Sequence, residues 1–211
     1  MIKFQDIETS SYKKTWELQK EMQSKRVKNL VGDTVLFVEH EPVYTFGKNA
    51  NKNHLLQNYP ENVKVYNIER GGDVTFHGPG QLVGYPIIDL HNYRMSISWY
   101  MRSLELIIIN SLSHFGIIAD RKEGLTGVWV NNEKIAALGV RISRWVTMHG
   151  FAINVNTNLE YYDSIIPCGI FEYGITSMKN ILGKDQNMKA VKRELKNQFK
   201  INFKKEFKVV N

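Results

Sequence analysis

A glycine-rich segment at residues 69–81 separates two stretches that have the composition of buried strands. The segment reads E-R-G-G-D-V-T-F-H-G-P-G-Q and holds four of the fifteen glycines of the chain. The runs VKVYNIE before it and QLVGYPIIDL after it are rich in β-branched and aromatic residues, which favours strands. Glycine lets the backbone turn sharply and approach a ligand that a Cβ would keep away. The pattern therefore predicts a sheet whose connecting loop is either a ligand floor or only a tight turn.

This loop differs from the two common phosphate-binding loops. The chain contains no G-x-x-x-x-G-K-[ST] motif, which places a lysine and a hydroxyl near bound phosphates and Mg²⁺. The segment does not read G-x-G-x-x-G either, and it leads into a strand rather than into a helix. We therefore expect no nucleotide site of either type, and a ligand that meets the cation of Arg70 and the imidazole of His77.

Strand patterns outnumber helical patterns in the rest of the sequence. Further strands are expected at residues 2–5, 34–40, 43–47, 127–130, 133–142 and 145–156. Hairpins are frequent and helical crossovers few, which is typical of an α+β fold with a mixed, largely antiparallel sheet and packed helices. With 211 residues and no linker composition, we expect one domain that spans residues 1–211.

Three helices are expected to pack on this sheet. The first begins after residues 10–11, and its apolar positions are Tyr12, Trp16, Val27 and Leu30. The second has Ser96 as its N-cap and ends at Gly116. The third begins after Asn187 and turns inward Met188, Val191, Leu195 and Phe199. Residues 203–210 are expected to form a terminal strand.

Cysteine content and hydropathy indicate the compartment. A single cysteine excludes an internal disulfide, and a free thiol fits a reducing cytoplasm. The first residues have no apolar run fit for a signal peptide, and no stretch approaches the length of a membrane-spanning helix. The sequence therefore predicts a cytoplasmic protein with no membrane partner.

The positive charge of the chain is concentrated near its end. The formal net charge is +7, and residues 184–211 carry nine Lys or Arg against three Asp or Glu. Such a segment is a docking patch for an acidic partner, a nucleic-acid footprint, or only the solvated face of a helix. No zinc-finger, homeodomain or RNA-binding pattern accompanies the charge, so we expect no nucleic-acid partner.

Two residues have the surroundings of a reactive pair. Cys168 lies between a proline and a glycine, as expected for a thiol presented at a turn, although a lone cysteine also serves as a small buried hydrophobe. Lys134 begins the strand E-K-I-A-A-L-G-V, where strict alternation puts Lys134 and Ala136 on one face and Ile135 and Ala137 on the other. Lys134 either snorkels to water or points into a cleft, where its ammonium would lower the pKa of a neighbouring thiol from about 8.5.

The other histidines show no spacing typical of a metal site, and no metal is expected. Only His149 lies in a glycine-flanked strand, with the sequence H-G-F-A. A cysteine–histidine pair like that of thiol proteases is a further interpretation, but no local signature of those families is present.

Four segments, taken together, resemble the lipoyl(octanoyl) transferase family. They read R-G-G-D-V-T-F-H-G-P-G-Q, G-L-T-G-V-W-V…K-I-A-A-L-G-V, R-W-V-T-M-H-G-F-A-I-N-V and P-C-G-I…T-S, in order from about residue 40 to residue 177. The resemblance implies the biotin/lipoate ligase fold. It also implies transfer of an octanoyl group from acyl carrier protein to a lysine of a lipoyl domain.

The resemblance assigns roles to individual residues. Cys168 would be the acyl-accepting nucleophile, and Lys134 the residue that tunes its pKa. The residues implied in acyl binding are Arg70, Gly71, Gly72, Asp73, Val74, Thr75, Phe76, His77, Ala137, Leu138, Gly139, Gly150, Phe151 and Ala152. Phe76 stands where the family often has a tyrosine, which removes at most one hydroxyl.

The chemistry of such a transfer needs no cofactor. The octanoyl group arrives as an activated thioester, so neither ATP nor a nucleotide motif is required. The implied acceptors are the lipoyl domains of 2-oxoacid dehydrogenase complexes and the glycine cleavage H protein. Two alternatives stay open: an ATP-dependent lipoate-protein ligase of the same fold, and a non-catalytic module that binds acyl carrier or lipoyl domains. The H-G-P-G-Q loop and P-C-G favour the transferase.

Overall fold

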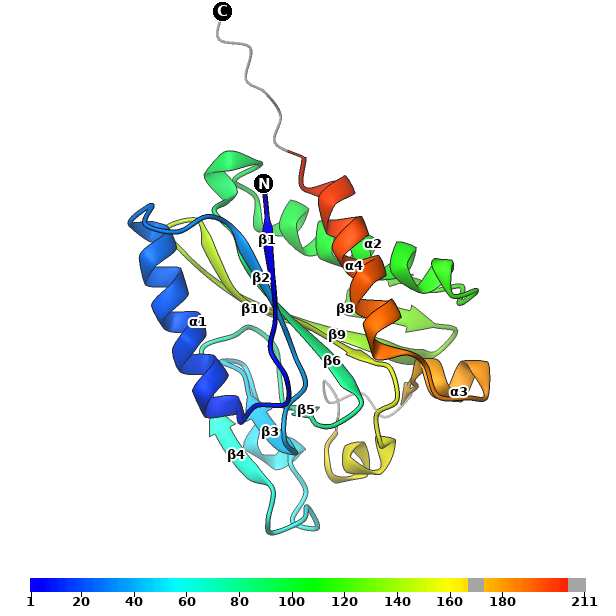
Figure 1. Ribbon diagram of the computed structural model, residues 1–211. Coiled ribbons are helices and arrows are strands. Elements are labelled where there is room, and N and C mark those ends of the chain that lie inside the picture. The colour runs from blue at the N-terminus through cyan, green and yellow to red at the C-terminus, as the bar shows by residue number, and fades with distance from the viewer. Residues whose placement is uncertain (167–172, 205–211) are drawn as a thin grey trace, which may run out of the picture.

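The computed structural model describes residues 1–166 and 173–204, and these form a large and a small sheet with helices on both sides (Figure 1). Within the described residues the large sheet has eight strands, of which seven follow the order β1-β2-β6-β10-β9-β8-β7 while β11 pairs with β9. Its strands are β1 Lys3–Asp6, β2 Thr34–Val38, β6 Gln81–Ile87, β7 Asp120–Lys122, β8 Leu125–Val130, β9 Glu133–Ser143, β10 Val146–Asn154 and β11 Gly174–Ile175. Among the described pairs of this large sheet, β1/β2 and β9/β11 are parallel and the others are antiparallel, so the prediction of a mixed, largely antiparallel sheet is confirmed.

The small sheet has the order β4-β3-β5, with β3 Val43–Phe46, β4 Lys64–Asn67 and β5 Thr75–His77. The glycine-rich segment therefore does not run as one loop to β6, because residues 75–77 within it pair with β3. The segment leaves the small sheet at β5 and enters the large sheet at β6, and so joins the two sheets covalently.

Helices cover both faces of the large sheet (Figure 1). The described α-helices are α1 Tyr12–Val27, α2 Ile97–His114, α3 Met178–Leu182 and α4 Met188–Asn202; short 3₁₀ helices lie at Lys52–His54, Leu90–Asn92 and Leu159–Ser164. One face packs Val35 and Phe37 of β2 against α2 and α4 in the main core. The opposite face packs Leu36 and Val38 beneath α1. This alternation along β2 is the period-two pattern of a strand buried on both sides.

The ends and the inner face of α2 and α4 agree with the sequence prediction. The Ser96 hydroxyl accepts a hydrogen bond from the Trp99 N–H at 3.2 Å, and the Asn187 side chain caps α4 by accepting from Ala190 N–H at 3.2 Å. Val191, Leu195 and Phe199 are at most 2% exposed. The expected terminal strand at 203–210 falls mainly outside the described residues. None of the helices in the described ranges is long and apolar enough to cross a bilayer.

The inner face of α1 differs from the prediction. The helix ends at Val27, and Leu30, expected on its apolar side, is 70% exposed. The buried side chains are instead mostly polar: Tyr12, Thr15, Gln19, Gln23 and Arg26. Gln19, Gln23 and Arg26 find partners on other segments, at His149, Val146 and Asp33, which a one-dimensional apolar pattern does not reveal.

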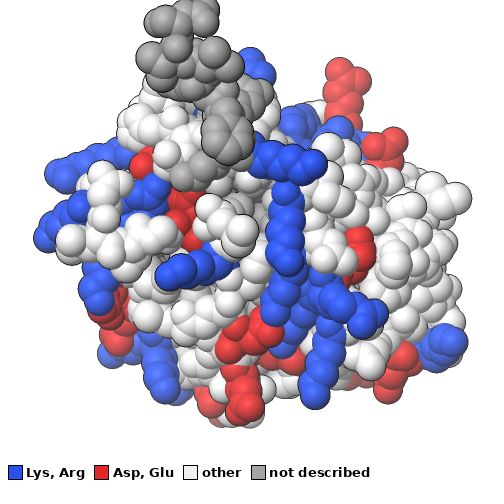
Figure 2. Space-filling model, turned by 45° about the horizontal axis from the view of Figure 1, so that its top comes forward, with Lys and Arg blue, Asp and Glu red and all other residues white. Residues whose placement is uncertain are grey.

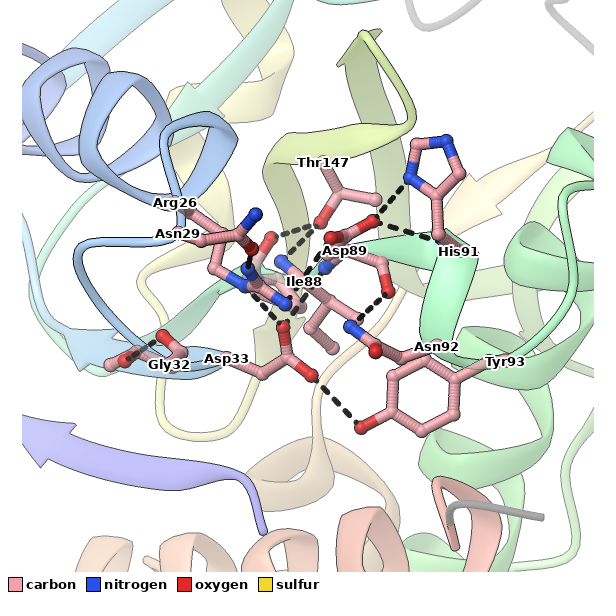
Figure 3. A network of polar contacts seen from close by, with 12 residues as sticks. Arg26, Asn29, Gly32, Asp33, Ile88, Asp89, His91, Asn92, Tyr93 and Thr147 are labelled. Atoms are coloured by element: carbon pink, nitrogen blue, oxygen red, sulfur yellow. Dashed lines mark hydrogen bonds and ion pairs between the residues drawn. The ribbon is translucent and has the colours of Figure 1, made fainter. Parts of the chain in front are cut away.

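Arg26 is the centre of the network that holds the end of α1 (Figure 3). Its Nε donates to Asp33 Oδ1 at 2.8 Å, and its Nη2 lies 3.2 Å from Asp89 Oδ2. Asp33 also accepts from the Tyr93 hydroxyl at 3.0 Å. Farther up the helix, Gln23 Nε2 donates to the carbonyl of Val146 at 2.8 Å. The helix is therefore attached to the sheet largely by buried hydrogen bonds.

Candidate active site

A cavity of about 310 Å³ lies between the large sheet and the glycine-rich segment. Most residues that the sequence predicted to contact substrate come together around it. Those that line it are Arg70, Gly72, Asp73, Val74, Thr75, His77, Ala137, Leu138, Gly139, Gly150, Phe151 and Ala152, together with Lys134. The volume is at the lower end of the range for small-molecule sites.

Two of the predicted contact residues lie behind the lining. Gly71 donates its backbone N–H to the carbonyl of Val140 at 3.0 Å and so fastens the loop to β9. Phe76 is 1% exposed and stacks on Tyr161, with ring centroids 4.4 Å apart, in the core of the small sheet. Both residues support the wall of the cavity from outside.

The floor of the cavity is a set of small residues in register across three strands. Ala152 of β10 pairs with Ala137 of β9 on one side and with Val83 of β6 on the other. One step along the cavity face, Gly150 pairs with Gly139. A Cβ on Gly139 would lie 3.0 Å from Arg70 Cδ and 2.8 Å from a loop carbonyl, so only glycine lets the loop approach this closely.

Arg70 shapes the loop. The side chain is 7% exposed, and its Nη2 donates to the carbonyl and to the hydroxyl of Thr45 at 2.7 and 3.0 Å. Its Nη1 donates to the carbonyl of Gly71 at 3.0 Å. Through these bonds the guanidinium ties the glycine-rich segment to β3, across the roof of the cavity.

Lys134 lies in the cavity wall at the start of β9. Its side chain is 8% exposed, and Nζ lies 4.7 Å from the centroid of the Trp129 ring, within the range of a cation–π contact. Gly127 of β8 lies close beside the lysine side chain, because a Cβ on Gly127 would come 3.1 Å from Lys134 Cε. Of the two interpretations made from sequence, the structure shows the one in which the lysine points into a cleft.

A β-bulge corrects the predicted faces of β9. Trp129 pairs with Lys134 while Val128 pairs with Ala136, so β9 has one extra residue between these pairs. As a result Ile135 and Ala136 both pack into the main core, and Lys134 and Ala137 both line the cavity. The expectation that Lys134 and Ala136 share a face was therefore wrong. Bulges commonly re-aim a side chain beside an active site in this way.

Two buried histidines, His77 and His149, line the cavity, and a third, His40, packs against the His77 ring with centroids 5.8 Å apart. Burial is the main cause that lowers the pKa of His40 to about 4 and those of His77 and His149 to about 3. His40 Nδ1 donates to the carbonyl of Ser10 at 2.9 Å, so its Nε2 accepts from the Tyr85 hydroxyl at 2.7 Å. His77 Nδ1 bonds Gln81 Oε1 at 2.8 Å. These rings are neutral at physiological pH.

His149 lines the cavity but was not among the residues predicted to bind substrate. It has φ +59°, is 1% exposed, and its backbone N–H donates to Gln19 Oε1 on α1 at 3.0 Å. Its ring Nε2 lies 4.0 Å from Glu69 Oε2. The only signal in the sequence was its place directly before Gly150, in the strand H-G-F-A.

Cys168, the predicted nucleophile, lies outside the described residues. Described residues on both sides of it in sequence line the same cavity as Lys134: Ile165 on one side, and Tyr173, Gly174 and Ile175 on the other. Ile175 pairs directly with Lys134 through β11 and β9.

The arrangement of sheets and helices is that of the lipoate and biotin protein ligases. A bipartite lipoate protein ligase from Thermoplasma acidophilum, described in one structural analysis with its E2 lipoyl domain, superposes with a TM-score of 0.69 at 15% identity, over 95% of this chain and 82% of that one. Biotin protein ligase from Aquifex aeolicus gives a TM-score of 0.56 at 16% identity, over 95% and 67%. The predicted fold is thus confirmed.

Sequence comparison narrows this class to one family. Residues 11–200 match the model of the lipoyl protein ligase A/B catalytic domain, and the chain belongs to that family. It is 48% identical to an octanoyltransferase from Gloeobacter violaceus over 75% of this chain and 72% of the relative. It is 43% identical to an octanoyltransferase from Christiangramia forsetii over 98% and 97%.

Proposed function

We propose that this chain is an octanoyltransferase, a single catalytic domain over residues 1–211 acting in the cytoplasm. It would move an octanoyl group from acyl carrier protein to a lysine of a lipoyl domain, through a thioester on Cys168. The observation that carries the proposal is Lys134, a buried lysine held in the wall of a largely apolar cavity beside the strand that follows Cys168. The relatives named octanoyltransferase support the same reaction.

The first half-reaction forms the acyl-enzyme. The Cys168 thiolate attacks the thioester carbonyl of the octanoyl carrier, a new carbon–sulfur bond forms, and the carrier sulfur leaves as a thiolate that takes up a proton. An ammonium at Lys134 favours the thiolate form of a neighbouring cysteine and so raises the fraction of reactive nucleophile. One thioester replaces another, so this step is close to balanced in free energy.

The second half-reaction transfers the chain to the acceptor. The ε-amine of a lipoyl-domain lysine attacks the same carbonyl, a carbon–nitrogen bond forms, and Cys168 leaves as a thiolate. The proton lost by the amine passes to Lys134, which gave its own proton to the leaving carrier thiolate in the first half-reaction. The amide is more stable than the thioester, which drives the transfer forward.

The cavity suits an acyl chain. Its floor is Ala137, Ala152 and the glycines beside them, and Leu125, Ile165 and Ile175 are among its other apolar lining residues. A saturated chain needs apolar surface and close approach rather than hydrogen-bond donors. Backbone N–H groups of the glycine-rich turns are the available donors for an oxyanion at the reacting carbonyl.

Different observations favour the two proposed protein substrates. A structural analysis of an archaeal lipoylation system names a lipoate protein ligase of the same fold and its E2 lipoyl domain, which favours lipoyl domains as acceptors. For the carrier, a groove between β1 and α4 is lined by five cations and two carboxylates; its charged residues are Asp6, Glu8, Lys189, Lys192, Arg193, Lys196 and Lys200. Lys and Arg side chains also form a band across the face shown in Figure 2. This surface is complementary to an acidic carrier protein.

Intact-protein mass spectrometry tests the proposal. After incubation with octanoyl carrier protein alone, the wild-type chain should gain the mass of one octanoyl group, and Cys168→Ala should gain none. Adding a lipoyl domain should remove the group from the enzyme and leave it on the domain. A Cys168→Ala chain that still transfers octanoyl groups at the wild-type rate would refute the acyl-enzyme.

The same mixture separates the alternatives. A lipoate-protein ligase A with a bound ATP superposes on this chain with a TM-score of 0.71 at 13% identity, so ligase chemistry is compatible with the fold. A ligase would release pyrophosphate from ATP with free octanoate or lipoate and would not need Cys168. A binding module would hold the carrier in a salt-sensitive way and leave its octanoyl group in place.

A further inference from the structure

The floor of the cavity has a definite width across the sheet. The residues Ala137, Ala152 and Val83 lie side by side on β9, β10 and β6. Neighbouring strands are about 4.8 Å apart, so this row spans about 9.6 Å. An extended octanoyl chain contains seven carbon–carbon bonds of about 1.5 Å and spans about 9 Å. The row begins at Ala137, three residues along β9 from Lys134, and ends at β6.

At β6 the cavity is closed by large side chains. Val83 and Tyr85 of β6 and Tyr12 of α1 all line it, with exposed fractions of 1%, 3% and 3%. Val83 and Tyr85 also pack with Leu36 and Val38 of the neighbouring strand. There is therefore no open route past this end of the row among the described residues.

This end wall is held rigidly. The Tyr85 hydroxyl donates to His40, which in turn donates to the carbonyl of Ser10. The Tyr12 ring stacks on the His77 ring, with centroids 5.8 Å apart and planes 8° apart. Buried aromatic rings in hydrogen-bonded positions cannot move aside without losing those bonds.

We propose that the wall formed by Tyr12, Val83 and Tyr85 selects the length of the acyl chain. The proposal rests on the transferase function, because it takes the reacting carbonyl to lie on the Lys134 side of the cavity. A chain of eight carbons fills the row from β9 to β6. A longer chain meets side chains that cannot yield, and a shorter chain leaves methylene-sized space unfilled, at about a fourfold loss of affinity for each methylene not buried.

Size changes at Val83 test the wall. Val83→Ala removes two methyl groups from its centre and should raise the use of decanoyl over octanoyl carrier by about fourfold or more. Val83→Leu lengthens the side chain by one methylene and should shift the preference toward hexanoyl carrier. Tyr85→Phe removes the bond to His40, so the wall loosens and the chain-length profile should broaden. The measurement is kcat/KM for hexanoyl, octanoyl, decanoyl and dodecanoyl carriers.

Val35→Ala is the matched control. It makes the same change in a residue that is 0% exposed, but on the opposite face of the sheet, in the main core. It should lower the melting temperature as Val83→Ala does and leave the ratio of decanoyl to octanoyl use unchanged. Equal shifts in both variants, or no shift in either Val83 variant, would overturn the proposed wall.

The outcome for the wild type separates this inference from the function on which it rests. If the wild-type chain transfers all four acyl lengths equally well, the transferase function holds and the proposed wall is refuted. A chain that accepts no acyl group from any carrier refutes the transferase itself.

Discussion

The buried histidines predict that this protein loses stability at mildly acidic pH. His40, His77 and His149 have pKa values lowered by burial to about 4, about 3 and about 3, from an ordinary value of 6.5. Since the folded pKa values lie below the unfolded ones, the unfolded chain binds more protons between these limits. The stability that the neutral rings contribute is therefore present above about pH 6.5 and is lost progressively as the pH falls toward 4 for His40 and toward 3 for His77 and His149.

The size of the effect follows from the same values. A pH of 5 is about 1.5 units below the ordinary pKa of histidine, so these histidines are protonated in the unfolded chain while the folded rings are still neutral. This difference costs about 2 kcal/mol of stability per residue. Three residues together give about 6 kcal/mol. The free energy of unfolding of a domain is about 5–15 kcal/mol, so this loss is enough to bring the protein close to unfolding.

Urea unfolding followed by tryptophan fluorescence, repeated from pH 7.5 down to pH 5, measures this dependence. His149→Gln and His149→Leu should each remove about a third of the slope, because neither side chain titrates in this range. The two variants will differ in stability at pH 7.5 through packing, but their slopes should agree. A free energy of unfolding that stays constant between pH 7 and pH 5, or a wild-type slope retained in both variants, would refute the assignment of three neutral buried rings.

The remaining predictions concern the proposed reaction. Lys134→Met should slow acylation by octanoyl carrier strongly at pH 7 and recover near pH 9, where a thiol with a pKa of about 8.5 ionises unaided; a flat loss at both pH values would contradict this role. Gly139→Ala should destabilise the fold by about 1–3 kcal/mol and reduce acylation, measured by urea unfolding and intact mass, because a Cβ there meets the loop at 2.8 Å. Neutralising Lys192, Arg193 and Lys196 together should raise KM for the carrier and make that KM less dependent on salt, while KM for the lipoyl domain stays the same. Equal effects on both substrates would argue against carrier docking at α4.

Several features could be predicted from the sequence because they depend on neighbours along the chain. Apolar spacing and capping residues at Ser96 and Asn187 gave two of the helices, and β-branched runs gave most of the strands. The family pattern supplied the residues of the cavity, and all but Gly71 and Phe76 of those in its acyl-binding set line it.

Other features needed partners that lie far away in the sequence. The inner face of α1 carries Gln19, Gln23 and Arg26, which only become compatible with burial once His149, Val146 and Asp33 are in place to bond them. Hydrophobic periodicity does not detect a buried polar face of this kind, because it counts these residues as solvent-exposed.

The sequence by itself determined most of the strands, the helices α2 and α4 and the α+β class, since propensity, capping and turn chemistry act over a few residues; the family pattern supplied the residues predicted to bind the acyl chain. The tertiary structure decided which way Lys134 points, because the bulge that turns it into the cavity exists only in the pairing of β9 with β8. It also decided the protonation of His40, His77 and His149, because the removal of water around a ring depends on everything packed against it. Interactions between neighbours in the sequence set the secondary structure. Register and burial between distant segments set the orientation and the protonation of the side chains.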